Sequence, residues 1–562
     1  MVSQAQHIRG SVPVRSLAAM LEDPCSTACR ALSKLYPDEA VLPEKAQLCL
    51  GAVRAFMRHF GQDASVLVAR APGRINLVGM HVDHRGGFVN PIAIKDVFFV
   101  FEPRGDDEVH LCNADDAAFP ARSFAISKGL PRHKIADWDA WSQQEFEERK
   151  RRGEAADWSN YVKSAVLYLQ HIHTRPDGAF DPPLRGMNMA VSGNVPMAAG
   201  LSSSSAIVVG AAEACIRVNA IAMGALELVE ACRLAEWYVG TRGGGGDHAA
   251  IKFGRKGHIL HVAAFPVSVK ALPFPESHSI VLANSLVEAK KQEGARDVFN
   301  ERVACYVFGF AMLRRNFPRY ASMMEHLRDV NPRTLGVSEA AIYRMLRSLP
   351  ERCTRTEILD CLPDDRALVE RTFRTHAEPG DGYRIRQVCA YGITECIRSE
   401  MAGEMLRIGD IRGFGELIDI SHEGDRVTRL LDGKRVPNDN ALPDEELRDL
   451  IADAESGQPE RVERSRLWRQ PGGYDVSTEE QDTLVDIARS MPGVAGAGLV
   501  GAGLGGAIIA VVERQQAQAV IDAFAEHYYE PRGLPVAAEV VRPTEGSGIL
   551  DPAFAAELAS AE

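Results

Sequence analysis

The chain has 562 residues, of which 46% are hydrophobic and 25% charged, so it is too long for one compact core and too apolar for wholesale disorder. Its 64 Lys and Arg against 76 Asp and Glu leave a formal net charge of −12, which argues against a general nucleic-acid coat and against binding to an anionic membrane. No stretch approaches the ~18 consecutive apolar residues that a membrane span needs, and the first residues lack the apolar core of a secretory signal. We therefore expect a cytoplasmic protein whose 11 cysteines, which form no CxxC pair, are free thiols.

The predicted elements begin with a proline-broken segment. Residues 1–45 contain four prolines and predict short helices, which we treat as an N-terminal extension. Residues 44–60 carry apolar side chains near helical spacing and predict a helix, whereas residues 65–71 alternate and predict a strand. The apolar run at 91–103 predicts further strands. The charge-dense stretch 140–157 predicts a solvated helix or an insertion.

The rest of the chain continues to mix the two periodicities. A strand and a turn are predicted at 186–197, further strands at 251–265, 279–285 and 507–513, and further helices at 206–222, 225–239, 297–350, 385–432 and 478–490. Residues 433–473 are polar and charged and predict a loop-rich insertion. Helices and strands interleave without strict alternation, which favours an α+β arrangement.

A glycine–serine run is the first candidate binding segment in the sequence. Gly200-Leu201-Ser202-Ser203-Ser204-Ser205 follows Pro196 and precedes a predicted helix. Glycine lets backbone N–H groups approach an anion, and a helix N-terminus offers donors and partial positive charge to phosphate. The alternative is a plain serine-capped helix. The chain contains no GxxxxGK[ST] and no HRD…DFG set, so a Walker-type loop and a protein kinase are both excluded.

Two other glycine-rich segments and two acids complete the candidates. Residues 501–506 match GxGxxG, but a strand pattern follows, which favours a tight strand–turn–strand over a dinucleotide site. Residues 73–87 crowd arginine, histidine and aspartate side chains between glycines, a composition suited to hydroxyl-rich ligands and phosphate, although a plain surface loop is the alternative. Glu236 lies within the predicted helix at 225–239, and Asp247 follows four glycines that leave its backbone accessible.

In order, these segments resemble the motifs of the GHMP small-molecule kinases and, among them, of the galactokinases. The resembling stretches are the sugar signature at 71–91, the phosphate-loop motif at 191–206, the segment with the metal-binding Glu and catalytic Asp at 234–258, and the third motif at 494–512. Shorter galactokinase-like segments lie at 414–427, 474–488 and 528–549. The resemblance covers most of 46–310 and 380–550.

The resemblance implies a two-lobed GHMP kinase fold of the α+β class, with the active site in the cleft between the lobes. It implies an N-terminal lobe over 46–275, which carries the sugar signature and the phosphate loop. It implies a C-terminal lobe over 276–562, with insertions near 315–380 and 433–473.

Carried over position by position, the resemblance also implies roles for single residues. Asp247 matches the catalytic aspartate, and Arg74 matches the arginine beside it. Glu236 and Ser204 match the Mg²⁺ ligands. The implied sugar-site positions are Met80, His81, Asp83 and Gly244, and the implied ATP-binding residues are Pro196, Gly200, Leu201, Ser202, Ser203 and Ser204.

These residue types suit phosphoryl transfer from ATP, which needs mainly positioning and charge neutralisation. Mg²⁺ prefers hard oxygen ligands such as a carboxylate and a serine hydroxyl. Asp247 would accept or orient the proton of the sugar's C1 hydroxyl, and Arg74 would keep Asp247 ionised. We expect ATP and a monosaccharide as the bound molecules, no nucleic acid and no membrane; the oligomeric state stays open.

Departures from the signature bear on the sugar. The signature glutamate that contacts the C6 hydroxyl is replaced by Met80, which offers no comparable acceptor, and the signature tyrosine and asparagine by His84 and Arg85. Other changes are His248 for glutamine and Gly498 for arginine. We therefore expect a sugar 1-kinase for a galactose-related sugar altered at C6, either L-arabinose or galacturonate. The alternatives are a true D-galactokinase and a non-catalytic regulator that senses sugar and ATP.

Overall fold

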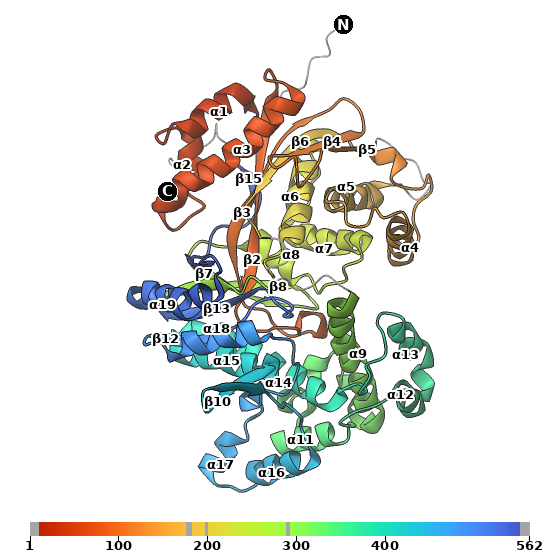
Figure 1. Cartoon of the computed structure of the whole chain (residues 1–562). Coiled ribbons are helices and arrows are strands. Elements are labelled where there is room, and N and C mark those ends of the chain that lie inside the picture. Colours follow the sequence, from red (N-terminus) through yellow and green to blue (C-terminus); the bar gives the residue numbers. More distant parts are fainter. Residues whose placement is uncertain (1–9, 176–182, 197–199, 288–292, 551–562) are drawn as a thin grey trace.

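The computed structural model describes residues 10–175, 183–196, 200–287 and 293–550, and it has two halves stacked one above the other (Figure 1). Each half is built around its own β-sheet, and helices cover both faces of each sheet. Helices and strands interleave along the chain, so the expected α+β class is confirmed.

A seven-stranded sheet organises the upper half. In spatial order its strands are β1 (Val12–Pro13), β2 (Ser65–Asn76), β3 (Pro91–Pro103), β6 (Met187–Gly193), β4 (Glu108–Asn113) and β5 (Arg122–Ala125), with β15 (Gly548–Leu550) also paired to β2. All neighbouring strands are antiparallel except β4 and β6, which run parallel. The predicted strand at 65–71 therefore extends to Asn76, and the pairing of β2 with β3 shifts register between Ala71 and Gly73.

The two faces of this sheet bury different cores because successive strand residues point to opposite sides. On β2, Val66 and Val68 pack against the N-terminal helices, whereas Leu67 and Ala69 pack against the opposite layer. The helices on the first face are α1 (Val14–Glu22), α2 (Thr27–Ser33) and α3 (Leu42–Phe60). The proline-broken segment thus forms the short helices expected for it and shares its core with α3.

The opposite face of the upper sheet carries the helices that hold the predicted phosphate loop and acids. They are α5 (Ser159–His173), α6 (Ser203–Val218), α7 (Ala225–Ala235) and α8 (Gly246–Phe253), with α4 (Trp138–Arg151) beside them. A hairpin follows, formed by β7 (His258–Ala263) and β8 (Ser268–Pro273). The strand predicted from residue 251 was wrong at its start, because α8 continues to Phe253 and the strand begins only at His258.

A four-stranded antiparallel sheet organises the lower half. Its order is β12 (Val494–Leu499), β13 (Ala507–Glu513), β9 (His278–Asn284) and β14 (Ala538–Val541). On β13, Ile508 and Ala510 face the helices α18 (Glu479–Ser490) and α19 (Ala517–Phe524), whereas Ile509 and Val511 face α15 (Ile411–Asp425). The turn between β12 and β13 confirms the predicted strand–turn–strand at residues 501–506.

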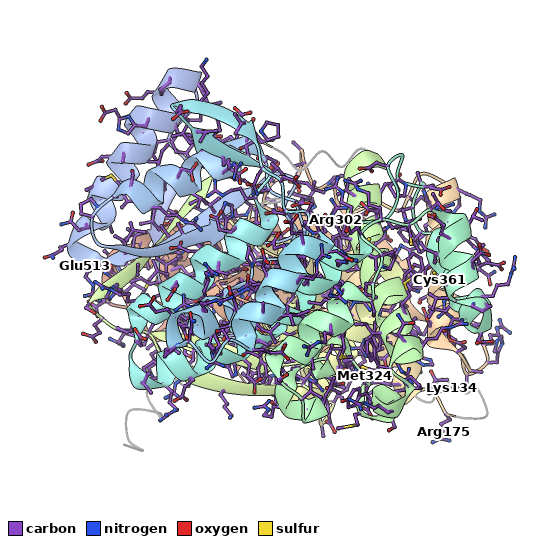
Figure 2. The ribbon with its side chains drawn as sticks, turned by 90° about the horizontal axis from the view of Figure 1, so that it is seen from below. Lys134, Arg175, Arg302, Met324, Cys361 and Glu513 are labelled. Carbon is purple, nitrogen blue, oxygen red and sulfur yellow. The ribbon has the colours of Figure 1, made fainter. Side chains whose placement is uncertain are left out.

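A third core lies beside this sheet and consists of long helices and of helices from the two segments, 315–380 and 433–473, that were predicted to be insertions. Its elements are α9 (Glu293–Asn316), α10 (Pro332–Leu335), α11 (Glu339–Arg347), α12 (Arg355–Cys361), α13 (Arg366–Phe373), α14 (Ile385–Ile408) and α16 (Asp444–Ala454). The short α17 (Pro459–Arg464) follows α16 and has no buried residue. Figure 2, seen from below, has Glu513 at one edge and Cys361 toward the other, so the insertion helices extend away from the sheet.

The second insertion differs from the loop-rich segment that its polarity predicted. It contains α16, α17 and β11 (Lys434–Pro437), and β11 forms a hairpin with β10 (Thr428–Leu431) just before the insertion, where the helical prediction for 385–432 was wrong. Helix α16 forms because Leu447, Leu450 and Ile451, at helical spacing, bury one apolar stripe in the third core. Its buried acid, Asp453, forms ion pairs with Arg461 and Arg464 of α17. The division of the chain into lobes at residue 275 stays a prediction.

Two expectations about the chain's chemistry can be compared with the structure. All 11 cysteines are free thiols, as expected. Across the part of the chain that the structure describes, none of the helices combines the length and the apolar character needed to cross a membrane.

Candidate functional site

The sugar loop, defined here as residues 79–87, connects β2 to β3 on a constrained backbone. Gly79 has φ +95°, and a Cβ there would lie 2.1 Å from the carbonyl oxygen of Phe88, so only glycine fits. The Asn76 side-chain amide donates to the Gly79 carbonyl at 3.0 Å and holds the turn. The chain then passes through His81 into a 3-10 turn, η2 (Asp83–Arg85).

Arg74, near the end of β2, links Asp247 to the phosphate loop. Its Nε donates to Asp247 Oδ1 at 2.7 Å and its Nη2 to Oδ2 at 2.8 Å, a bidentate pair that fixes the carboxylate plane. Its Nη1 donates to the Gly200 carbonyl at 2.6 Å, and its backbone N–H donates to the Leu201 carbonyl at 3.0 Å. The structure therefore brings together the predicted catalytic pair and the predicted phosphate loop, although they lie far apart in the chain.

Asp247 stands in the first turn of α8 with an ionised carboxylate. The Ser202 hydroxyl donates to Oδ2 at 2.5 Å, in addition to the two bonds from Arg74. Burial alone would raise the pKa of Asp247, but the Arg74 charge and these hydrogen bonds lower it below its usual value. The side chain keeps 36% of its surface exposed, so a ligand can still approach it.

The phosphate loop leads into α6 through Ser202, which has the left-handed φ of +55°. Its side chain makes no cap hydrogen bond to α6, so the first N–H groups of this helix have no capping side chain. Ser203 and Ser204 occupy the first turn and are half-buried, and Pro196 is exposed before the loop. Residues 197–199 lie outside the described residues.

The third glycine-rich motif supports this loop from the other half of the protein. Gly200 and Gly501 both have positive φ, +78° and +81°. A Cβ on Gly501 would lie 2.7 Å from the Gly200 Cα, and a Cβ on Gly200 would lie 3.0 Å from the Val500 carbonyl oxygen. Two glycine backbones therefore pack directly against each other, which side chains larger than glycine would prevent.

Glu236, the predicted metal ligand, is 4% exposed. Its Oε1 accepts a hydrogen bond from the Ser205 hydroxyl at 2.6 Å and lies 3.3 Å from His248 Nε2. Ser204, the serine that the motif indicated, has no hydrogen bond to Glu236; the contact belongs to the next residue. Burial alone would lower the pKa of His248, but the adjacent Glu236 carboxylate raises it above its usual value.

Whether Glu236 and the nearby serines can bind Mg²⁺ depends on which of their oxygen atoms are free to act as ligands. Within the described ranges, no group of three or more His, Cys, Asp and Glu side chains could hold a metal by itself. The donors present are the Glu236 carboxylate, whose Oε2 accepts no hydrogen bond from the described residues, and serine hydroxyls at the start of α6. Mg²⁺ commonly takes one or two protein oxygens and completes its shell with phosphates and waters, so these residues fit it.

Two predicted sugar-site residues, Asp83 and Gly244, lie in direct contact. The Gly244 N–H donates to Asp83 Oδ2 at 3.2 Å, and a Cβ on Gly244 would lie 2.9 Å from that oxygen. The His84 ring nitrogen Nδ1 lies 3.1 Å from Asp83 Oδ1. Burial alone would raise the pKa of Asp83, but the hydrogen bond and charge of His84 lower it well below its usual range.

The other two sugar-site positions, Met80 and His81, have buried side chains. Met80 is 4% exposed, and its sulfur lies 3.6 Å from the Asn76 amide nitrogen. The His81 ring stacks on Tyr474 at 4.1 Å between centroids, and its Nε2 lies 3.3 Å from Asp425 Oδ1. Both side chains therefore support the loop from beneath in this structure.

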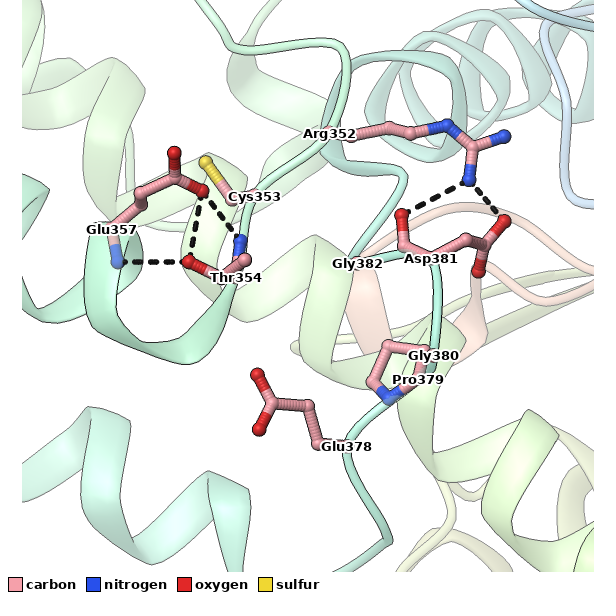
Figure 3. Close-up of a pocket in the computed structure, with 9 residues that line it drawn as sticks. All are labelled: Arg352, Cys353, Thr354, Glu357, Glu378, Pro379, Gly380, Asp381 and Gly382. Carbon is pink, nitrogen blue, oxygen red and sulfur yellow. Dashed lines mark hydrogen bonds and ion pairs between the residues drawn. The ribbon is translucent and has the colours of Figure 1, made fainter.

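A surface hollow of about 610 Å³ lies in the first insertion, away from these groups (Figure 3). Its charged side chains are already paired: Arg352 binds Asp381, and Glu357 binds Thr354 in a helix cap. The hollow contains none of the predicted site residues, so size alone does not mark it as a reaction site.

Sequence reasoning missed three residues that contact the site. Ser205 and His248 both contact Glu236, and each stands directly beside a residue that the motifs had indicated. The third, Glu395 on α14, accepts hydrogen bonds from the backbone of the sugar loop. Nothing local marks Glu395, because it lies within a long helix without a motif.

Three family models match separate parts of the chain. They describe the GHMP kinases N terminal domain at residues 160–255, the galactokinase galactose-binding signature at 54–101, and the GHMP kinases C terminal at 445–530. The first covers the phosphate loop and both acids, and the second covers Arg74 and the sugar loop.

Curated relatives and one solved structure agree with these matches. A galactokinase of Roseiflexus sp. (strain RS-1) is 26% identical over 496 residues, which cover 88% of this chain and 95% of the relative. A galactokinase of Chloroflexus aurantiacus is 27% identical over 84% of this chain and 90% of the relative. The crystal structure of Lactococcus lactis galactokinase complexed with galactose shares the fold, with a TM-score of 0.59 and 21% identity over 88% of this chain and 97% of that chain.

Proposed function

This chain belongs to the GHMP kinases, on their galactokinase-like branch, and as a sugar kinase of that type we propose that it transfers the γ-phosphoryl group of ATP to the anomeric C1 hydroxyl of a monosaccharide. One observation carries the proposal. The ionised, half-exposed Asp247 lies between the phosphate loop, which it contacts through Ser202, and the Gly244–Asp83 pair of the sugar signature.

Asp247 acts as the proton acceptor. A carboxylate has about four lone-pair positions, and Arg74 and Ser202 use three of them, so one remains for the sugar hydroxyl. As the sugar oxygen bonds to the γ-phosphorus, the bond from that phosphorus to the β–γ bridging oxygen breaks and ADP leaves. The hydroxyl proton passes to Asp247. The Arg74 guanidinium keeps the carboxylate ionised before transfer and offsets negative charge near the reacting phosphoryl group.

The loop from Gly200 to Ser204 binds the phosphates of ATP in this proposal. Its glycine admits a close approach, and the uncapped start of α6 offers backbone N–H groups and partial positive charge. Glu236 and a serine hydroxyl, either Ser204 or Ser205, hold Mg²⁺. When bound, the ion neutralises charge on the phosphate oxygens.

D-galactose is the first sugar to test. The replacement of the signature glutamate by Met80 argued for a sugar altered at C6, but the Met80 side chain is 4% exposed, which weakens that argument. The curated relatives cited above are galactokinases. A uronic acid such as galacturonate is the second candidate, because the partly buried Arg85 of the sugar loop has a buried Nε without a hydrogen-bond partner among the described residues. No comparable observation favours L-arabinose, which stays in the screen.

The experiment is an ATP-consumption screen over D-galactose, L-arabinose and D-galacturonate, with the site of phosphorylation read by phosphorus NMR. We expect phosphate at C1 and the highest kcat/KM for D-galactose. If galacturonate alone is phosphorylated, the substrate is this acidic sugar and not D-galactose. Binding of ATP and sugar without any turnover would identify a sensing protein and refute the kinase proposal.

A further inference from the structure

The far end of the sugar loop is held by an arginine of the first insertion. Arg328 lies in η6 (Leu327–Asp329), and its Nη1 donates to the Gly86 carbonyl at 2.9 Å. The same guanidinium donates to two carbonyls that directly follow β7, at 2.5 and 2.6 Å. A Cβ on Gly86 would lie 2.9 Å from Arg328 Cδ, so loop and side chain are packed without spare room.

The near end of the loop is held by a buried carboxylate. Glu395 on α14 is fully buried, and its Oε1 accepts the N–H groups of Gly79 at 2.8 Å and Met80 at 3.1 Å. The Ser421 hydroxyl donates to the same oxygen at 2.9 Å. Hydrogen bonds to an ionised acceptor are stronger than neutral ones, so this contact fixes the backbone just before His81.

The second insertion reaches the loop through a relay. Arg398, also fully buried, donates from Nε to Glu395 Oε2 at 2.7 Å. Its Nη1 donates to the carbonyls of Trp468 at 3.1 Å and Gln470 at 2.8 Å, both within the insertion near 433–473. The insertion therefore orients Arg398, and Arg398 orients Glu395.

We propose that the two insertions form a clamp on the sugar loop, with Arg328 and Glu395 as its positioning residues. The inference rests on the proposed sugar-kinase function, because the clamped segment carries Asp83. A loop held at both ends loses less conformational freedom when the sugar binds, so the clamp increases sugar affinity. ATP affinity depends on the separate loop before α6 and is independent of the clamp.

The principal variant is Arg328→Met, which keeps the apolar stem and removes the donors. Arg328 Nε also lies 3.7 Å from Asp329 Oδ1, and the two side chains are 29% and 18% exposed, so both charges keep some contact with water and thermal melting of the variant shows whether the loss of this pair affects the fold. We expect the D-galactose KM, and the D-galactose Kd by calorimetry, to rise about tenfold, while the ATP KM stays within about twofold. Arg328→Lys, which keeps one donor group, gives an intermediate value.

The matched control is Arg333→Met in the same insertion. Arg333 also bridges to α14, through Glu400 at 2.8 Å, but it is 78% exposed and does not touch the sugar loop, so both KM values stay unchanged. Glu395→Gln tests the other end, and its thermal melting separates a looser loop from a misfolded protein. A neutral amide in place of Glu395 would leave Arg398 without its charge partner. The clamp proposal is therefore tested by the Arg328 variants.

Two outcomes overturn the clamp. One is a folded Arg328→Met protein whose D-galactose Kd equals that of the parent, and the other is an equal rise in the KM of sugar and ATP. A parent protein that binds D-galactose but transfers no phosphate refutes the proposed function instead. In that case the clamp proposal is still tested by comparing the D-galactose Kd of the Arg328 variants with that of the parent.

Discussion

Replacing Asp247 by asparagine removes one oxygen and the negative charge while keeping the size of the side chain. In the structure the two carboxylate oxygens accept three hydrogen bonds, two from Arg74 and one from Ser202. An asparagine NH₂ group placed toward any of these donors leaves at least one of them without an acceptor. The variant therefore loses the proton acceptor and also disturbs the link to the phosphate loop.

The expected loss follows from the role of a general base. Removing such a group typically lowers the rate by about 10²–10⁴-fold, which corresponds to roughly 3–5 kcal/mol in activation free energy. In the proposed function ATP also contacts the loop before α6, and the sugar also contacts Asp83 and Gly244, so we expect the binding of both to change much less than kcat.

The assay is ADP release under saturating ATP and D-galactose, with the Kd of each substrate measured by calorimetry. Asp139→Asn is a matched control, because Asp139 also pairs with an arginine, Arg242, but its side chain is 56% exposed and lies outside the site. We expect the control to keep the parent kcat. An Asp247→Asn protein with kcat within a few-fold of the parent's would refute the assigned role.

Three further substitutions test other parts of the structure. Glu236→Gln should raise the Mg²⁺ concentration needed for half-maximal turnover, with partial rescue at high Mg²⁺, and an unchanged titration curve would contradict the metal role. Met80→Glu places a carboxylate at a 4% exposed position whose N–H already contacts Glu395, so we expect a melting temperature several degrees lower; a stable variant with an altered sugar ranking would show that this position faces the sugar. Tyr36→Phe removes the 2.8 Å hydrogen bond from the N-terminal extension to the buried Asp96 and should cost about 1 kcal/mol in urea unfolding, whereas an unchanged unfolding midpoint would contradict that contribution.

Local patterns were sufficient for the elements that carry the site. The helical spacing at 44–60, the alternation at 65–71 and the glycine turn at 501–506 all correspond to observed elements, because each depends on neighbours in the chain. The loop prediction for the polar stretch 433–473 was wrong because its helix α16 depends on distant segments of the chain. The apolar stripe of α16 is short and becomes stable only when it packs into the third core.

The sequence by itself determined which chemistry is available: a glycine–serine loop before a helix, a bare-backbone aspartate and an arginine at a strand end, in the order typical of GHMP kinases. Only the tertiary structure decided how these side chains are used. It brought Ser205 rather than Ser204 to Glu236, turned Met80 and His81 into the interior, and set Glu395 against the sugar loop across 316 residues of chain. Backbone turns follow from local residue types, whereas the direction of a side chain depends on packing between distant segments, which no short motif encodes.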